Sequence, residues 1–176
     1  DSDRPVLIHC AAGKDRTGVA VADVTERRNV DRAVATLTEA LGTADILVNS
    51  AGILRVGAML EQPYEDFARQ FRVNVDGTFH VCQAVVPAMV AKGRGAVINL
   101  SSWLGKKGMK LYGGYAASKF AVIGMTQALA LEVAASGVRA GSLCPGLIVE
   151  TGMRDQAEAL RRSLGLPSAA ERVATI

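Results

Sequence analysis

Short apolar runs alternate with longer amphipathic stretches along the chain. Four to six apolar residues followed by turn residues predict buried strands at 5–9, 19–22, 45–49, 96–100 and 138–143. Apolar positions with helical spacing predict helices over 29–41, 64–91 and 112–136. A glycine that can close a helix in the left-handed conformation follows each of these stretches, at Gly42, Gly93 and Gly137. This alternation predicts an α/β fold whose parallel sheet is buried on both faces.

The first two apolar runs are too close together for a parallel connection. Only a few residues separate Cys10 from Val19, whereas a parallel crossover needs about a dozen or more. Two arrangements remain open. Either residues 17–28 continue as a helix, since they contain no Gly or Pro after Gly18, or the run at 19–22 is a strand that is not parallel to the first. The Val and Ala residues of this run favour the strand.

Composition narrows the class of protein. The chain has 176 residues, of which 49% are hydrophobic and 21% charged, as expected of one globular domain. A net charge of +3 without a basic stripe gives no support to nucleic-acid binding. The cysteines at 10, 82 and 144 are too few and too widely spaced for a disulfide framework or a metal site, which indicates a reducing compartment. With no visible signal peptide or membrane span, we expect a cytoplasmic protein with no membrane partner.

One group of polar residues suits proton transfer. Tyr115 and Lys119 are four residues apart, so on a helix the phenol and the ammonium lie on the same face. A nearby cation favours the phenolate and lowers the pKa of a tyrosine, which prepares it for acid/base work. Ser102 directly follows the predicted strand 96–100, at the edge where open α/β sheets bind their ligands. Its hydroxyl could hold a substrate oxygen beside Tyr115.

Further motifs surround these residues in a fixed order. They are ADVT at 22–25, NSAG at 49–52, FRVNVDGTF at 71–79, INLSS at 98–102, YAASK at 115–119 and CPG at 144–146. From about residue 18 to residue 153, the chain therefore resembles the short-chain dehydrogenase/reductase family. The resemblance implies a Rossmann-like, doubly wound, mostly parallel sheet. It also implies an NAD(P)-dependent oxidoreductase that interconverts a secondary alcohol and a ketone.

The resemblance assigns roles to the catalytic residues. Tyr115 is the acid/base, Lys119 lowers its pKa and binds the nicotinamide ribose, and Ser102 orients the substrate carbonyl. Asn74 completes a water-linked proton relay. The partner is a small alcohol or ketone, and the long predicted helices imply a homodimer or homotetramer.

The same resemblance assigns the cofactor, NAD or NADP. Asp23 contacts the adenine ring, and the carboxamide lies near the backbone of Ile148. Tyr115 and Lys119 also belong to this cofactor site. The remaining positions are Asn49, Ala51, Gly52, Pro145, Gly146 and Thr151.

A second group of candidate catalytic residues lies near the start of the sequence. HCAAGKDRTG at 9–18 resembles the signature loop of cysteine-dependent protein and lipid phosphatases, in its bacterial form. By this resemblance Cys10 is the nucleophile, Arg16 clamps the phosphate and Thr17 eases thiolate departure, with Asp15 a candidate general acid. A helix starting near Thr17 would add its positive end to the phosphate site. In a related alternative, this loop holds the cofactor pyrophosphate.

The dehydrogenase family opens with a strand and a TGxxxGxG turn for the pyrophosphate, and neither has a counterpart in this sequence. A polar stretch at 153–164 matches the family's substrate lid, but the closing helix and strand do not follow. We therefore expect a fold truncated at its N-terminal dinucleotide half and at its C-terminal end. Residues 1–17 form a phosphatase-like strand and loop, and 18–176 form a partial dehydrogenase domain. The alternatives to a dehydrogenase with impaired cofactor binding are a phosphatase and a non-catalytic chimeric or truncated scaffold.

Overall fold

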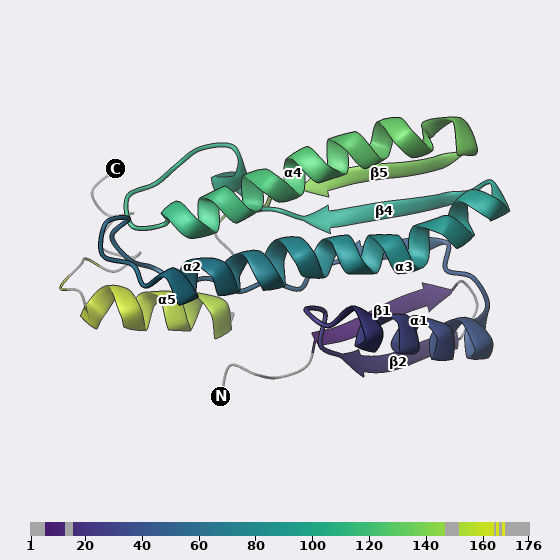
Figure 1. The fold of residues 1–176 in the computed structure, drawn as a ribbon, viewed down its shortest axis with the longest axis horizontal. Coiled ribbons are helices and arrows are strands. Elements are labelled where there is room, and N and C mark those ends of the chain that lie inside the picture. The colour runs from purple at the N-terminus through teal and green to yellow at the C-terminus, as the bar shows by residue number, and fades with distance from the viewer. Residues whose placement is uncertain (1–5, 13–15, 147–151, 164, 166, 168–176) are drawn as a thin grey trace.

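A computed structural model of the chain describes residues 6–12, 16–146, 152–163, 165 and 167. Its strands are β1 (Val6–Ala12), β2 (Arg16–Ala22), β3 (Ile46–Asn49), β4 (Gly95–Leu100) and β5 (Val138–Leu143). Its α-helices are α1 (Arg27–Leu41), α2 (Tyr64–Phe71), α3 (Gly77–Lys92), α4 (Gly113–Val133) and α5 (Gly152–Ser163). Figure 1 shows how they are arranged. The predicted strands and helices are confirmed to within a few residues at their ends.

The central sheet is parallel. Strands β3, β4 and β5 lie side by side in that order, with Asn49 opposite Asn99 and Asn99 opposite Ser142. Helix α3 connects β3 to β4, and α4 connects β4 to β5 (Figure 1). The Rossmann-like, mostly parallel sheet is therefore confirmed. Because the strands are parallel, their carboxyl ends lie at one edge, where the polar residues that follow them come together.

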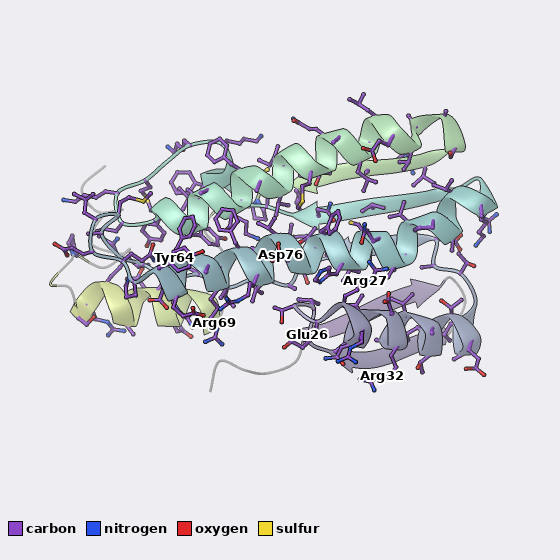
Figure 2. The ribbon with its side chains drawn as sticks, viewed as in Figure 1. Glu26, Arg27, Arg32, Tyr64, Arg69 and Asp76 are labelled. Carbon is purple, nitrogen blue, oxygen red and sulfur yellow. The ribbon has the colours of Figure 1, made fainter. Side chains whose placement is uncertain are left out.

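Helices α3 and α4 cover one face of this sheet, and α1 packs against α3 and against strand β2. The side chains that this face buries include Leu47 of β3, Val97 of β4 and Val138 of β5, each no more than 4% exposed. Met89 of α3 is completely buried among them. Arg27 of α1, which is labelled in Figure 2, donates a hydrogen bond to the Gln83 side chain of α3 and so holds α1 against α3, and it forms an ion pair with Asp31 within α1. The core thus fixes the strands from the helical side.

The other face of the sheet is open among the described residues. Side chains alternate along a strand, and the outward positions Ile46, Val48 and Ile98 are 48%, 46% and 37% exposed. The prediction of a sheet buried on both faces is therefore wrong for the described part of the chain. The apolar runs gave the correct strands, but they could not show whether a second layer of helices would cover them.

The first two strands form an antiparallel hairpin. Cys10 pairs with Gly18 and Ala12 with Arg16, so β2 begins only a few residues after β1 ends. Of the two arrangements considered, the non-parallel strand is confirmed and the helix over 17–28 is wrong, since α1 begins at Arg27. The short connection allows a hairpin but no crossover.

The described strands of this hairpin do not have the arrangement that a phosphatase loop requires. Arg16 and Thr17 lie in β2, opposite Ala12 and Ala11 of β1, and no helix begins at Thr17. Their backbone groups therefore take part in a ladder and do not converge on a phosphate. Asp15 lies outside the described residues. The same geometry gives no support to a pyrophosphate nest at 10–17.

Helices α2 and α3 are continuous through one wide turn. Residues Arg72–Asp76 form a π-helical turn between them, and this turn carries Asn74. Such turns place an extra residue in a helix and are frequent at functional sites. Among the described residues, no helix is both long enough and apolar enough to cross a membrane.

Candidate active site

Ser102 lies where β4 ends and a short 3-10 turn (Trp103–Gly105) begins. It is 7% exposed, and its hydroxyl oxygen accepts a hydrogen bond from the backbone N–H of Leu104 at 3.2 Å. Two further bonds fasten this segment to the end of β5: Ser101 N–H to the Leu143 carbonyl (2.8 Å) and Trp103 N–H to the Pro145 carbonyl (2.9 Å). The serine thus has a fixed position between two strand ends.

Tyr115 and Lys119 come from one face of α4, as their spacing predicts. Tyr115 is 8% exposed and Lys119 is 4% exposed. The Lys119 ammonium nitrogen lies 5.7 Å from the centre of the Tyr115 ring and donates to the Leu100 carbonyl at 2.8 Å. The structure therefore brings Ser102, Tyr115 and Lys119 together at the carboxyl end of β4.

The electrostatics of Tyr115 differ from the sequence-based expectation. Burial raises the pKa of the Tyr115 phenol, and a hydrogen bond with the Ser102 side chain opposes that rise. The expected lowering of this pKa by Lys119 is not found, because the ammonium lies beside the ring and burial is the larger effect. At neutral pH the phenol consequently carries its proton, ready to donate it.

Burial also changes Lys119. It lowers the pKa of the ammonium from 10.5 to about 8, against a smaller raising effect from Cys144. A buried cation loses hydration, so its neutral form becomes easier to reach. Lys119 remains mostly protonated at neutral pH, and one of its protons is used by the Leu100 carbonyl. The others are available to a ligand.

Asn74 ties three segments together beneath this group. Its side-chain amide donates to the Ile53 carbonyl (3.0 Å) and to the Ser118 hydroxyl (2.9 Å), and its oxygen accepts from the Ile53 N–H (2.8 Å). Ser118 in turn donates to the Tyr115 carbonyl at 2.7 Å. Asn74 thereby links the loop after β3 to the turn of α4 that carries Tyr115.

Two further serines support the catalytic segments, and neither was predicted from the sequence. Ser118 receives the Asn74 amide, and Ser101 donates to the Lys119 carbonyl at 2.8 Å. They are 0% and 5% exposed. Their signal was a hydroxyl next to each catalytic residue, in the pairs 101–102 and 118–119. Such serines occur in many turns and helices, so only the fold shows that they connect catalytic segments.

A glycine allows the Ser102 turn to approach α4 closely. A Cβ atom on Gly105 would lie 2.4 Å from the Ser101 hydroxyl and 2.9 Å from the Lys119 carbonyl. We expect Gly105→Ala to lower the free energy of unfolding by ~1–3 kcal/mol, because the turn must move away from the helix. Chemical denaturation measures this change. Gly108→Ala is the matched control, since nothing lies within 4 Å of its Cβ position; equal losses in both variants would contradict the account.

Two of the predicted cofactor residues, Asp23 and Asn49, lie in different surroundings. Asp23 is exposed at the end of β2, where its carboxylate accepts from the backbone and hydroxyl of Thr25. Asn49 points elsewhere, because its amide donates to the Asn99 side chain at 2.8 Å in a buried network. Asn99 continues that network to Thr126 at 2.9 Å. In this geometry Asn49 fastens the end of β3 to β4.

Other predicted cofactor residues lie near the strand ends. Ala51 and Gly52 follow β3 and are partly exposed, while Pro145 and Gly146 follow β5. Ile148 and Thr151 lie outside the described residues. No group of three or more His, Cys, Asp or Glu residues that could hold a metal occurs in the part of the chain that the structure describes.

Comparison with protein families decides the ancestry of this site. The family model described as short chain dehydrogenase matches residues 4–161. The chain belongs to the short-chain dehydrogenase family. The match begins within the segment that resembles a phosphatase loop, and no finding supports that second resemblance. The triad Ser102, Tyr115 and Lys119 lies inside the region that the short-chain dehydrogenase family model covers.

Curated proteins of the short-chain dehydrogenase family are similar to this chain. A sorbitol dehydrogenase of Cereibacter sphaeroides is 40% identical over 127 residues, which are 72% of this chain and 50% of that protein. A 2-keto-3-deoxy-L-fuconate dehydrogenase of Xanthomonas campestris is 35% identical over 161 residues, which are 91% of this chain and 52% of that protein. The chain thus spans about half the length of these curated short-chain dehydrogenases.

Solved short-chain dehydrogenase structures agree with the fold. An NAD+-bound xylitol dehydrogenase has a TM-score of 0.78 at 33% identity, covering 83% of this chain and 56% of the other. A gluconate 5-dehydrogenase from Burkholderia cenocepacia, in complex with NADP and tartrate, has a TM-score of 0.74 at 36% identity, covering 86% and 56%.

Proposed function

We propose that this chain is an NAD(P)-dependent oxidoreductase that interconverts a secondary alcohol and a ketone. The observation that supports it is the arrangement of the triad. The Tyr115 hydroxyl is hydrogen-bonded with Ser102, and the buried Lys119 ammonium lies beside the same ring. All three are at the carboxyl end of β4, where α/β sheets bind ligands.

The proposed reduction uses these side chains in distinct roles. The substrate carbonyl oxygen accepts hydrogen bonds from Ser102 and Tyr115, which hold it and polarise it. Tyr115 then gives its phenolic proton to that oxygen as the carbonyl carbon receives hydride. The Lys119 ammonium, whose nitrogen lies 5.7 Å from the ring centre, is the buried positive charge beside the phenolate that remains. In the oxidation direction each proton movement is reversed.

The nicotinamide would supply the hydride when bound. Around the triad the residues fit its ribose end: Lys119 is a buried cation that donates one hydrogen bond, to the Leu100 carbonyl, within the described part of the chain. Asp23 is an exposed carboxylate at the end of β2. For the pyrophosphate, the described residues offer no Gly-rich turn that leads into a helix, since β1 is paired with β2. The proposal therefore includes weak cofactor binding.

Other parts of the proposal rest on single features. Asn74 takes part in a proton relay through the one acceptor position that its side-chain oxygen has left.

A second copy of the chain packs on α3 and α4, whose surfaces expose Phe79, Phe120 and Leu131 at 47%, 46% and 83%. The described thiols Cys82 and Cys144 are unpaired, which supports a reducing compartment, the cytoplasm.

A cofactor titration tests this function. We expect nicotinamide fluorescence to change on titration of the chain with NADH or NADPH, with a dissociation constant of ~0.1–1 mM, and Lys119→Met to weaken that binding. Lys106→Met is the control, because Lys106 is exposed on the loop after the 3-10 turn. Binding weaker than millimolar for both nucleotides would contradict the function and leave the non-catalytic scaffold.

A further inference from the structure

Arg161 of α5 is a buried cation whose Nε has no hydrogen-bond partner. It is only 6% exposed. One terminal nitrogen donates to the Pro167 carbonyl at 2.9 Å, and its Nε is buried with no hydrogen-bond partner. Among the described residues, no carboxylate forms a salt bridge with it. A guanidinium that keeps its charge in such a place is costly, unless a ligand supplies the missing acceptor.

The position of Arg161 relates it to the active site. Ala157 is one helical turn earlier on the same face of α5, and it packs against the apolar cluster that contains Tyr115 and Tyr112. Residues four apart on a helix are neighbours. The face of α5 that bears Arg161 therefore adjoins the cluster that holds the catalytic tyrosine.

The loop that adjoins this cluster is basic as well. Met109 and Leu111 of the segment between Ser102 and Tyr115 pack on the same cluster as Ala157. This segment also carries exposed lysines at 106, 107 and 110, and no acidic residue. Lys107 lies over the Trp103 ring, 4.6 Å from its centre, next to Ser102. The segment that follows Ser102 therefore carries positive charge.

The neighbouring residues of α5 differ from Arg161 in exposure. Asp155 is exposed and is not among the described salt bridges. Glu158 offers its backbone carbonyl to Arg162 at 3.4 Å. Arg162, the next residue, is exposed. Two adjacent arginines thus differ in burial and in surroundings.

We propose that Arg161 binds a carboxylate on the substrate, so that the substrate is an oxo acid or the corresponding hydroxy acid. The planar guanidinium presents donors that match a carboxylate in a two-point contact, and its orphaned Nε would be one of them. The inference rests on the proposed function, because it names the substrate class of the same site. Arg161 then sets substrate specificity, while the carbonyl faces Ser102 and Tyr115.

A matched pair of probes tests this inference by binding alone. Acetoacetate and acetoacetamide have the same size and the same ketone, but only the first carries a charge. We expect the wild-type chain to bind acetoacetate ~10-fold or more tightly than acetoacetamide, as measured by ligand-observed NMR. Arg161→Met should remove that preference, and Arg161→Lys should restore part of it, since the charge returns without the planar fork.

Arg162→Met is the control, and it should keep the full preference for acetoacetate. Thermal melting checks that each variant is folded. Equal affinity of the wild type for both probes, or equal losses in the Arg161→Met and Arg162→Met variants, would overturn the inference. So would a parallel loss of NADPH binding in Arg161→Met, which would assign the arginine to the cofactor. Charge-dependent binding without any ketone reduction would contradict the proposed function and leave only the carboxylate contact of Arg161.

Discussion

Tyr115→Phe is expected to lower the rate of ketone reduction by ~10²–10⁴-fold, because the substrate oxygen then has no proton donor. The change removes one oxygen atom from a ring that remains 8% exposed in the same cluster, so the fold should persist. Cofactor binding should fall far less than the rate, because the buried Lys119 ammonium of the cofactor site is unchanged in this variant. Steady-state kinetics with a ketone, together with the nicotinamide titration, separate these two effects.

Tyr112→Phe is the matched control for this experiment. Tyr112 lies three residues earlier, is 6% exposed and belongs to the same apolar cluster. Unlike Tyr115, it has no hydrogen bond with Ser102. We expect the Tyr112→Phe variant to reduce the ketone at a rate within about threefold of the wild-type rate. Equal losses in the two variants would mean that the cluster needs its hydroxyl groups for packing, and that Tyr115 is not the proton donor.

Lys119→Met is expected to abolish reduction and, at neutral pH, to stabilise the fold. Burial lowers the pKa of Lys119 from 10.5 to about 8. Below pH 8 the lysine is therefore protonated in both states, and the folded state bears the cost of a buried charge. Replacing it by methionine removes this cost but also removes the hydrogen bond to the Leu100 carbonyl. The net result should be a rise in the free energy of unfolding on the order of 1–3 kcal/mol.

The stability difference between Lys119→Met and the wild type should depend on pH. Between about pH 8 and 10.5 the unfolded lysine holds more proton than the folded one, so wild-type stability rises with pH in that window. The advantage of Lys119→Met should therefore shrink as pH rises from 8 toward 10. Cys82, whose pKa burial raises to about 11, is present in both proteins, so its titration largely cancels in the difference.

Denaturation curves at pH 7 and pH 9.5 measure this difference. Lys110→Met is the control, because it removes an exposed lysine in place of a buried one; an equal gain in stability at pH 7 in Lys110→Met would contradict the explanation. Suppose instead that Lys119→Met is less stable than the wild type at pH 7, and that this difference in the free energy of unfolding is the same at pH 9.5. That result would contradict the energetic cost assigned to the buried charge of Lys119. The combination of lost activity and gained stability is the usual mark of a residue retained for function.

Local rules predicted much of the fold. The apolar runs at 96–100 and 138–143 became β4 and β5, and Gly93 and Gly137 close the preceding helices with positive φ angles of 74° and 72°. These features depend on neighbours in the sequence, which periodicity and glycine chemistry describe well. The common face of Tyr115 and Lys119 followed from the same kind of rule.

Features that depend on distant pairing were not predictable in this way. Buried and exposed side chains alternate along β3 and β4. This alternation depends on which helices cover the sheet, which is a property of the tertiary structure. Asn74 meets Ser118 across 44 residues of sequence, and the burial of Arg161 depends on what lies around α5. The raised pKa of Tyr115 was likewise beyond reach, because spacing shows a nearby cation but not the extent of burial.

Hydride transfer can be followed directly with nicotinamide cofactors that carry deuterium at the transferred position. The purified chain is incubated with deuterated NADH or NADPH and with acetoacetate or a neutral ketone, and the product alcohol is analysed by mass spectrometry. The account predicts deuterium on the carbinol carbon with the wild type, and a ~10²-fold or greater loss with Tyr115→Phe. No deuterated alcohol above the protein-free background, with either cofactor and either ketone, would contradict it.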